Sequence, residues 1–152
     1  MPTDKPDRSW RDRLKSLTSK VKFTDPASEV SIARAEAALS VKFPEELASP
    51  LRESNGVHGE YGLGLLWSVE RLQDDNLKFR TFSDFKEFYM PFDALLFFGD
   101  AGNGDQFAYT ILNGEVRRDD IFVWNHENDS RTWVAPSLGV FYEWWLTGKL
   151  KI

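Results

Sequence analysis

Residues 95–112 read LLFFGDAGNGDQFAYTIL, and the fold can be worked out from this stretch outward. Two short apolar runs flank a segment of three glycines, two aspartates and an asparagine. Apolar runs of this length that end in glycine and other turn residues are typical of buried strands. The stretch therefore predicts a strand from Leu95 to Phe98, a turn from Gly99 to Asp105, and a strand from Gln106 to Leu112, the first pair of an antiparallel sheet.

Other short apolar runs extend the sheet in both directions. The candidates for strands are Tyr61 to Trp67, Ile121 to Trp124, and Arg131 to Val134. Asn113-Gly114, which follows the second central strand, is a dipeptide preferred in tight hairpin turns. Residues 78–92 are dense in aromatic side chains, and both helix and strand stay open there.

Helices are predicted at both ends of the chain. From Trp10 to Val21 apolar residues recur at spacings of four, three and four, which is one stripe of an amphipathic helix. Capping residues, proline and glycine predict four more helices: Asp25-Pro26 to about Leu39, Pro44 to Asn55-Gly56, Ser68 to Leu72, and Ser137 to Gly148. Helices, then strands, then a helix predict a single α+β domain, whose central, mostly antiparallel sheet is packed by the N-terminal helices and the C-terminal helix.

Charge is distributed unevenly along the chain. The 152 residues include 24 acidic and 19 basic side chains, a net charge of −5, but residues 1–22 carry +4 and the remainder −9. We therefore expect a basic N-terminal arm and helix, residues 1–24, ahead of the α+β domain, residues 25–152. Because an acidic body repels phosphate backbones, direct binding of nucleic acid is disfavoured.

Several classes of protein are excluded or disfavoured. With no cysteine in the chain, disulfides, thiolate metal sites and cysteine nucleophiles are excluded. No apolar run reaches the roughly 18–20 residues of a membrane span, and Met1 to Arg13 lack the core of a signal peptide. We expect a cytoplasmic protein without a membrane partner. Residues 1–9 are polar and without apolar periodicity, so we expect them to be loosely ordered.

Residues able to carry chemistry are sparse. The two histidines, His58 and His126, are isolated from each other and from any second ligand at metal-binding spacing. Neither a serine nucleophile elbow nor a phosphate-binding glycine loop occurs. The sequence therefore predicts no catalytic residue, no metal and no cofactor. A small hydrolase that uses Asp100 and Asp105 is the minor alternative.

Acidic loops near tryptophans form the candidate partner-binding surface. Loops on a rigid sheet commonly carry function, and aromatic anchors dominate protein interfaces. The predicted site residues are Trp67, Asp74, Asp75, Asp100, Asn103, Asp105 and Trp124. We expect the acids after the Trp67 strand and those of the glycine-rich turn to share one edge, without nearby bases, and either tryptophan to be its anchor. The alternative is a turn with a structural role only, in which Asp and Asn bond their own backbone.

The front of the chain resembles a known family. Residues 39–47, LSVKFPEEL, followed by Leu51 and Asn55-Gly56, are similar to the opening motif of the SUKH superfamily. Further matching segments are Leu65 to Glu70, Leu96 to Gly99, Gly104-Asp105, Val123-Trp124, and the closing helix with Phe141, Trp145 and Leu146. The resemblance covers roughly residues 28–148, and Ser40 stands where the family commonly has glycine.

This resemblance implies an α+β fold with a mostly antiparallel sheet and no catalytic apparatus. Many bacterial members are immunity proteins that bind and block a cognate toxin, often a nuclease, in polymorphic toxin systems. Fungal relatives include a regulator of cell-wall synthesis that works through protein partners. We expect an immunity protein with a basic toxin as its partner, since nucleases are commonly basic and the body is acidic. A regulatory interaction module is the alternative.

Overall fold

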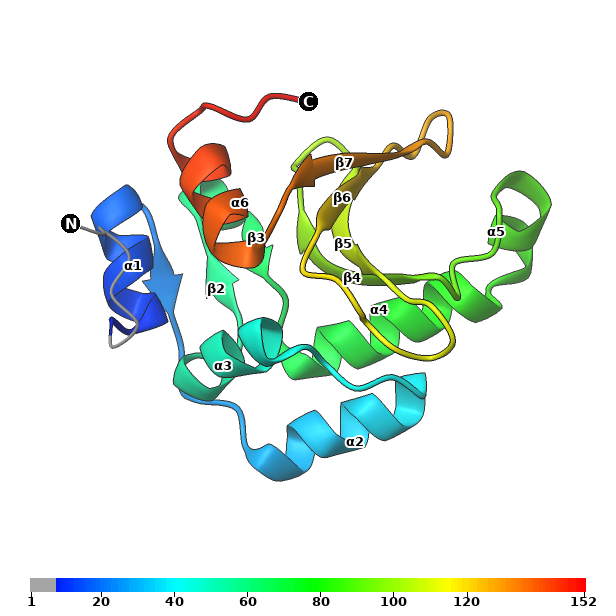
Figure 1. The fold of residues 1–152 in the computed structure, drawn as a ribbon, viewed down its shortest axis with the longest axis horizontal. Coiled ribbons are helices and arrows are strands. Elements are labelled where there is room, and N and C mark those ends of the chain that lie inside the picture. Colours follow the sequence, from blue (N-terminus) through cyan, green and yellow to red (C-terminus); the bar gives the residue numbers. More distant parts are fainter. Residues whose placement is uncertain (1–7) are drawn as a thin grey trace.

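The computed structural model describes residues 8–152 (Figure 1). The helices are α1 Trp10–Leu17, α2 Glu29–Leu39, α3 Glu45–Glu53, α4 Val69–Thr81, α5 Ser83–Phe88 and α6 Leu138–Leu146, with a 3₁₀ turn at Glu60–Gly62. The strands are β1 Lys22–Phe23, β2 Val57–His58, β3 Gly64–Leu66, β4 Leu95–Asp100, β5 Gln106–Thr110, β6 Ile121–Trp124 and β7 Arg131–Ala135. Residues 1–9 were expected to be loosely ordered, and residues 1–7 of this segment lie outside the described residues. Ser9 caps α1.

Two antiparallel sheets, ordered β1-β2-β3 and β4-β5-β6-β7, confirm the predicted α+β class. The sheets adjoin each other, because the Trp67 N–H after β3 donates to the Phe98 carbonyl of β4 over 2.8 Å. The backbones come so close here that a side chain on Gly99 would lie 2.9 Å from the Leu65 carbonyl oxygen. Glycine at position 99 therefore permits the junction of the two sheets.

Helices from both ends of the chain cover the sheets. α1 packs against α3 and α6, while α2 packs against α4 (Figure 1). Trp10 and Leu14 of α1 belong to the buried core, and β1 pairs with β2. The described part of the basic segment is thus packed into the same body as the residues that follow it. No helix among residues 8–152 is long and apolar enough to cross a membrane.

The first two helices differ from their predicted bounds. α1 ends at Leu17, and Lys22 and Phe23 form a strand because β2 offers them a partner. α2 begins after Ser28, whose hydroxyl accepts the Ser31 N–H, and not after Asp25. A serine three residues closer to the apolar stripe can cap the first turn directly, so it replaces the predicted cap.

The largest difference from the predicted elements lies in α4, which was predicted to end at Leu72. Ser68 caps α4 as predicted, but the helix continues to Thr81, so Asp74 and Asp75 lie on a helix and not in a loop. Residues 69–81 contain neither glycine nor proline, and the buried Asn76 joins the helix to β4. Its side chain accepts the Phe97 N–H and donates to the Phe97 carbonyl, at 2.8 and 2.9 Å.

Candidate protein-binding surface

Two turns leave the larger sheet on the same side. Gln106, where β5 begins, pairs with Asp100 at the end of β4 and with Trp124 at the end of β6. The turn formed by residues 101–105 and the hairpin turn formed by residues 125–130 are therefore neighbours. They are in direct contact, because Asp105 in the first turn bonds to His126 in the second.

A third loop, residues 59–63, lies against the first of these turns. A side chain on Gly102 would contact Leu63, and one on Gly64, at the start of β3, would lie 2.7 Å from the Asp100 carboxylate. Glycine at position 64 thus leaves room for that carboxylate. We name the surface of the three loops the loop end: residues 59–63, 101–105 and 125–130.

Arg71 brings two of the predicted site residues together. Its guanidinium holds both oxygens of Asp100, at 2.7 and 2.9 Å, and donates through Nε to Asp75 at 2.9 Å. The same guanidinium lies 4.1 Å from the centre of the Trp67 ring. Asp75 and Asp100 therefore share one edge, as expected, but the expectation that these acids lack a nearby base was wrong. The single positive charge of the arginine offsets one of the two negative charges, and its hydrogen bonds fix both carboxylates in position.

Asp105 joins the two turns at the loop end. It is buried, and its Oδ1 accepts the backbone N–H of His126 at 3.0 Å and lies 2.7 Å from Nδ1 of the same residue. Burial raises the pKa of the Asp105 carboxyl, but these contacts with His126 outweigh burial and hold the pKa below its ordinary value. Asn103 accepts the Asp105 N–H and keeps its own side chain exposed. Asp105 therefore fixes the loops and leaves Asn103 at the surface.

The two tryptophans proposed as aromatic anchors are buried. Trp67 is 1% exposed and Trp124 is 4% exposed. Trp124 packs edge-on against Phe92 and donates its ring N–H to Asp129 at 2.8 Å. Neither ring is available to a partner, so the predicted anchor role was wrong for both. Large apolar surface on a sheet is more stable inside the core than at its rim.

Tyr61 is the exposed aromatic at the loop end, and it was not among the predicted site residues. Its side chain is 98% exposed, and its backbone has φ 59° and ψ 23°, a left-handed conformation that is uncommon for a tyrosine. The adjacent Glu60 is exposed as well, as is Asp74 on α4. The predicted strand from Tyr61 to Trp67 is confined to β3, Gly64–Leu66. The sequence signal for an exposed Tyr61 was Gly59-Glu60-Tyr61-Gly62, since glycines on both sides of this segment weaken a strand.

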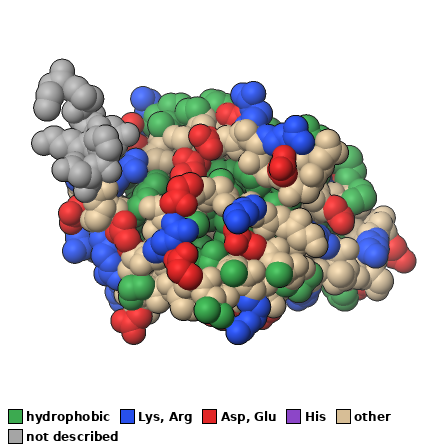
Figure 2. Space-filling model, turned by 60° about the horizontal axis from the view of Figure 1, so that its bottom comes forward, with side chains coloured by type: hydrophobic (Ala, Val, Ile, Leu, Met, Phe, Trp, Pro, Cys, Tyr) green, Lys and Arg blue, Asp and Glu red, His purple; other side chains and the backbone are tan. Residues whose placement is uncertain are grey.

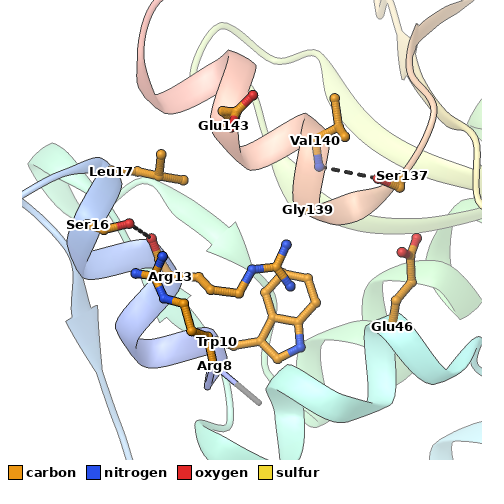
Figure 3. A pocket seen from close by; sticks show the side chains of 10 residues that line it. All are labelled: Arg8, Trp10, Arg13, Ser16, Leu17, Glu46, Ser137, Gly139, Val140 and Glu143. Atoms are coloured by element: carbon orange, nitrogen blue, oxygen red, sulfur yellow. Dashed lines mark hydrogen bonds between the residues drawn. The ribbon is translucent and has the colours of Figure 1, made fainter. Parts of the chain in front are cut away.

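A cavity of about 410 Å³ lies between α1 and α6 (Figure 3). Arg13 lies over the Trp10 ring at 4.2 Å, and Glu46 forms part of the wall. One oxygen of Glu46 accepts the Tyr109 hydroxyl at 2.9 Å and the Leu138 N–H at 3.1 Å. Burial raises the pKa of Glu46 above its ordinary value, although both bonds oppose the shift. The carboxylate thus fixes the start of α6 to β5.

Two serines near the same cavity bond to main-chain groups. In the same cavity the Ser16 hydroxyl donates to the Arg13 carbonyl, and the Ser137 hydroxyl accepts the Val140 N–H (Figure 3). Within residues 8–152, no cluster of three histidine or acidic side chains could hold a metal ion. On the face drawn in Figure 2 acidic and basic side chains are interspersed, without one large patch of either sign.

Residues 29–141 match a family model described as SUKH_6, SMI1-KNR4 cell-wall. The match runs from the first residue of α2 into α6 and includes every strand except β1, together with all three loops of the loop end. The comparison with curated proteins gave no match. Because the matched residues make up most of the 152, and because the motifs from residues 39–47 to Val123-Trp124 lie in them, the chain belongs to the SUKH superfamily.

Proposed function

We propose that this chain is a non-enzymatic protein-binding domain, an immunity protein that binds and neutralises a cognate toxin through the loop end. The observation that carries the proposal is Tyr61, fully exposed on a left-handed turn at the tip of a loop. A tyrosine in this position has no role in the core. Tyrosine is among the residues that contribute most to protein interfaces, and strained backbone is typical of functional positions.

The loops beside Tyr61 are fixed before any partner binds. Arg71 holds Asp100 in an ion pair, and Asp105 holds His126 through hydrogen bonds, so the backbone around the exposed residues is set by contacts inside the domain. A surface with little freedom to lose gives more of its interaction energy to binding. The same pairs use the polar groups that an enzyme would need, which supports binding and not catalysis.

Charge supports a basic partner. The chain after residue 22 carries a net charge of −9, and Glu60 and Asp74 are exposed acids without a bonded partner among the described residues. Complementary charge accelerates association and favours one class of partner over others. A toxin that acts on nucleic acid is a basic protein of this kind, and it would be met in the cytoplasm.

A regulatory interaction module is the second candidate. The observation that favours it is the description of the matching family, which names the cell wall. Both candidates bind protein, and they differ in the partner. A toxin gene beside the gene for this chain would distinguish immunity from regulation.

Co-expression tests the immunity proposal. Each product of a neighbouring gene is expressed with this chain, and growth of the host reports toxicity. We expect one product to be toxic alone, harmless with the chain, and recovered as a complex with it. If no neighbouring product is bound or neutralised, the immunity proposal is wrong.

Variants then test the loop end in that complex. Tyr61→Ala should weaken binding about tenfold or more, since a central tyrosine contributes over about 1.4 kcal/mol. Val30→Ser, which removes another exposed apolar side chain on α2, is the matched control and should bind normally. Glu60→Gln with Asp74→Asn should slow association at low salt only. Normal binding by Tyr61→Ala would move the interface elsewhere.

A further inference from the structure

A second hollow lies far along the chain from Tyr61, between α4 and the segment from α5 to Asp93. It has a volume of about 370 Å³. In Figure 1, α5 projects from the body beyond the end of α4. The hollow has aromatic walls and a charged rim. We name it the α5 pocket, and its principal lining residues are Phe79, Arg80, Phe85, Lys86, Tyr89 and Phe92.

The walls of the α5 pocket are built from rings that pack on each other. Phe79 stacks on Phe85 at 5.2 Å and meets Phe92 edge-on at 5.1 Å. The Tyr89 hydroxyl donates to the His126 carbonyl, and the Met90 N–H donates to Asp129. These bonds attach the segment after α5 to the hairpin at residues 125–130. The pocket is therefore formed without a ligand.

Exposed apolar side chains occur on α5 and at either end of it. Phe88 is 74% exposed, Met90 57% and Phe82 40%. Three of the large apolar side chains that remain exposed on the described chain thus lie within nine consecutive residues. Exposed apolar groups gathered in this way mark interaction sites more often than scattered ones do.

The rim carries two cations that form no ion pair. Arg80 donates to the carbonyls of Leu39 and Leu95, at 2.8 and 3.4 Å, and its Nε has no partner. The side chain of Lys86 forms no hydrogen bond or ion pair with any residue from 8 to 152. Asp93 also lines the pocket, but it lies outside ion-pair distance of Arg80. Two positive charges against one negative charge leave the pocket net positive.

We propose that the α5 pocket binds a segment of a partner protein in which a large apolar side chain lies beside a carboxylate. The apolar group would pack against the wall formed by Phe79, Phe85 and Phe92, where water is easily displaced. The carboxylate would bond to Lys86 and Arg80, whose donors are not used by acids of this chain. Asp84 and Glu87 on α5 and Asp93 on the rim repel a polyanion, so a nucleic acid is disfavoured. The proposal goes beyond the toxin-binding surface, because it concerns another part of the chain and a ligand of opposite charge.

A fragment titration tests the pocket directly. The probes are 3-phenylpropionate, which joins an aromatic ring to a carboxylate, and the neutral 3-phenyl-1-propanol, followed by amide chemical shifts of the ¹⁵N-labelled full chain. We expect 3-phenylpropionate to shift the amides of residues 79–93 and to bind in the millimolar range, as small fragments do. The alcohol should bind about threefold more weakly, because it lacks the charge. Equal binding of the two probes, or no shift at residues 79–93, would overturn the proposal.

Variants identify the groups that bind. Lys86→Gln should reduce affinity for the acid to that for the alcohol, whereas Lys20→Gln, an exposed lysine outside the pocket, should change neither. A blocked peptide Ser-Asp-Phe-Asp-Ser should bind better than Ser-Lys-Phe-Lys-Ser, and Tyr61→Ala should not affect it. Loss of peptide binding with Tyr61→Ala would overturn the separation of the two sites. If the chain alone dimerises and Phe88→Ser abolishes the dimer, a second copy occupies the pocket and the proposal is wrong.

Discussion

The loop end and the α5 pocket are both exposed, yet their charged side chains are arranged in opposite ways. Beside the loop end Arg71 bridges Asp75 and Asp100, and within it Asp105 holds His126, so these charged side chains stabilise the fold. At the α5 pocket the Arg80 guanidinium donates only to main-chain carbonyls, and the Lys86 side chain has no bonded partner in the described part of the chain. Paired charges give the first region its shape, whereas unpaired charges remain available to a ligand in the second. An acid in a loop is therefore not by itself a free negative charge.

The two regions meet at Trp124, where substitution should have the largest effect. Its ring packs against Tyr89 and Phe92 of the α5 pocket and donates to Asp129 of the loop end. Trp124→Ala should lower the free energy of unfolding by about 3–5 kcal/mol, because it leaves a cavity and removes one hydrogen bond to Asp129. Denaturant unfolding near neutral pH measures the loss. A loss below about 1 kcal/mol would show that the two regions are not joined through this ring.

The loss of stability caused by Asp105→Asn should depend on pH, which distinguishes the loop end from the α5 pocket. The substitution should cost about 1–2 kcal/mol near neutral pH, because it removes the charge that bonds to His126. The Asp105 pKa lies below the ordinary value of 3.8, so this stabilisation is present above that value and is lost as the pH falls through the lowered pKa. Unfolding of both proteins near pH 7 and about pH 3 should therefore give converging stabilities. A constant difference would exclude the ion pair as the cause.

Arg71→Gln tests whether paired charges hold the loop end in place. We expect a loss of about 1 kcal/mol, since the guanidinium is partly exposed, and faster hydrogen exchange in residues 101–105. Arg52→Gln is the matched control, because Arg52 also binds two acids, Glu29 and Glu45, at a more exposed site. It should change stability by less than about 0.5 kcal/mol. Equal losses would remove the distinction between the loop end and an ordinary exposed ion pair.

Tyr61→Gly should have the smallest effect on stability. Glycine relieves the left-handed conformation of Tyr61, which costs a residue with a side chain about 1–2 kcal/mol, but it also gives the unfolded chain more freedom. The two changes nearly cancel, so thermal unfolding should shift by no more than about 0.5 kcal/mol. A larger loss would mean that Tyr61 supports the fold, and it would weaken the case for Tyr61 as a binding residue.

Local sequence patterns predicted most of the fold. The pair of strands around Gly99 to Asp105, the caps Ser68 and Ser137, and the Asn113-Gly114 turn all depend on neighbours in sequence, and the structure confirms them. The short β1 strand could not be predicted, because two residues become a strand only when β2 lies beside them. The extension of α4 likewise depends on Asn76, whose partner Phe97 is distant in sequence.

The candidate site was less predictable than the fold. That Asp75 and Asp100 share an edge was expected, but Arg71 stands between them, and only the third dimension shows which charge an arginine meets. Counting aromatics could not separate the buried Trp67 and Trp124 from the exposed Tyr61, since exposure depends on packing. The glycines around Tyr61 were the one local signal.

Two bonds between α6 and much earlier residues determine when the chain can fold during its synthesis. Leu138 bonds to Glu46, 92 residues earlier, and the Tyr142 hydroxyl bonds to the Leu65 carbonyl, 77 residues earlier. On the ribosome, the helices and the three-stranded sheet would emerge while their last partner is still untranslated. The core can close only after residue 142 has left the exit tunnel, so native structure should form late and in one step. Contacts of such long range are also slow to form, which makes folding speed, and not only stability, a property that selection can act on in this chain.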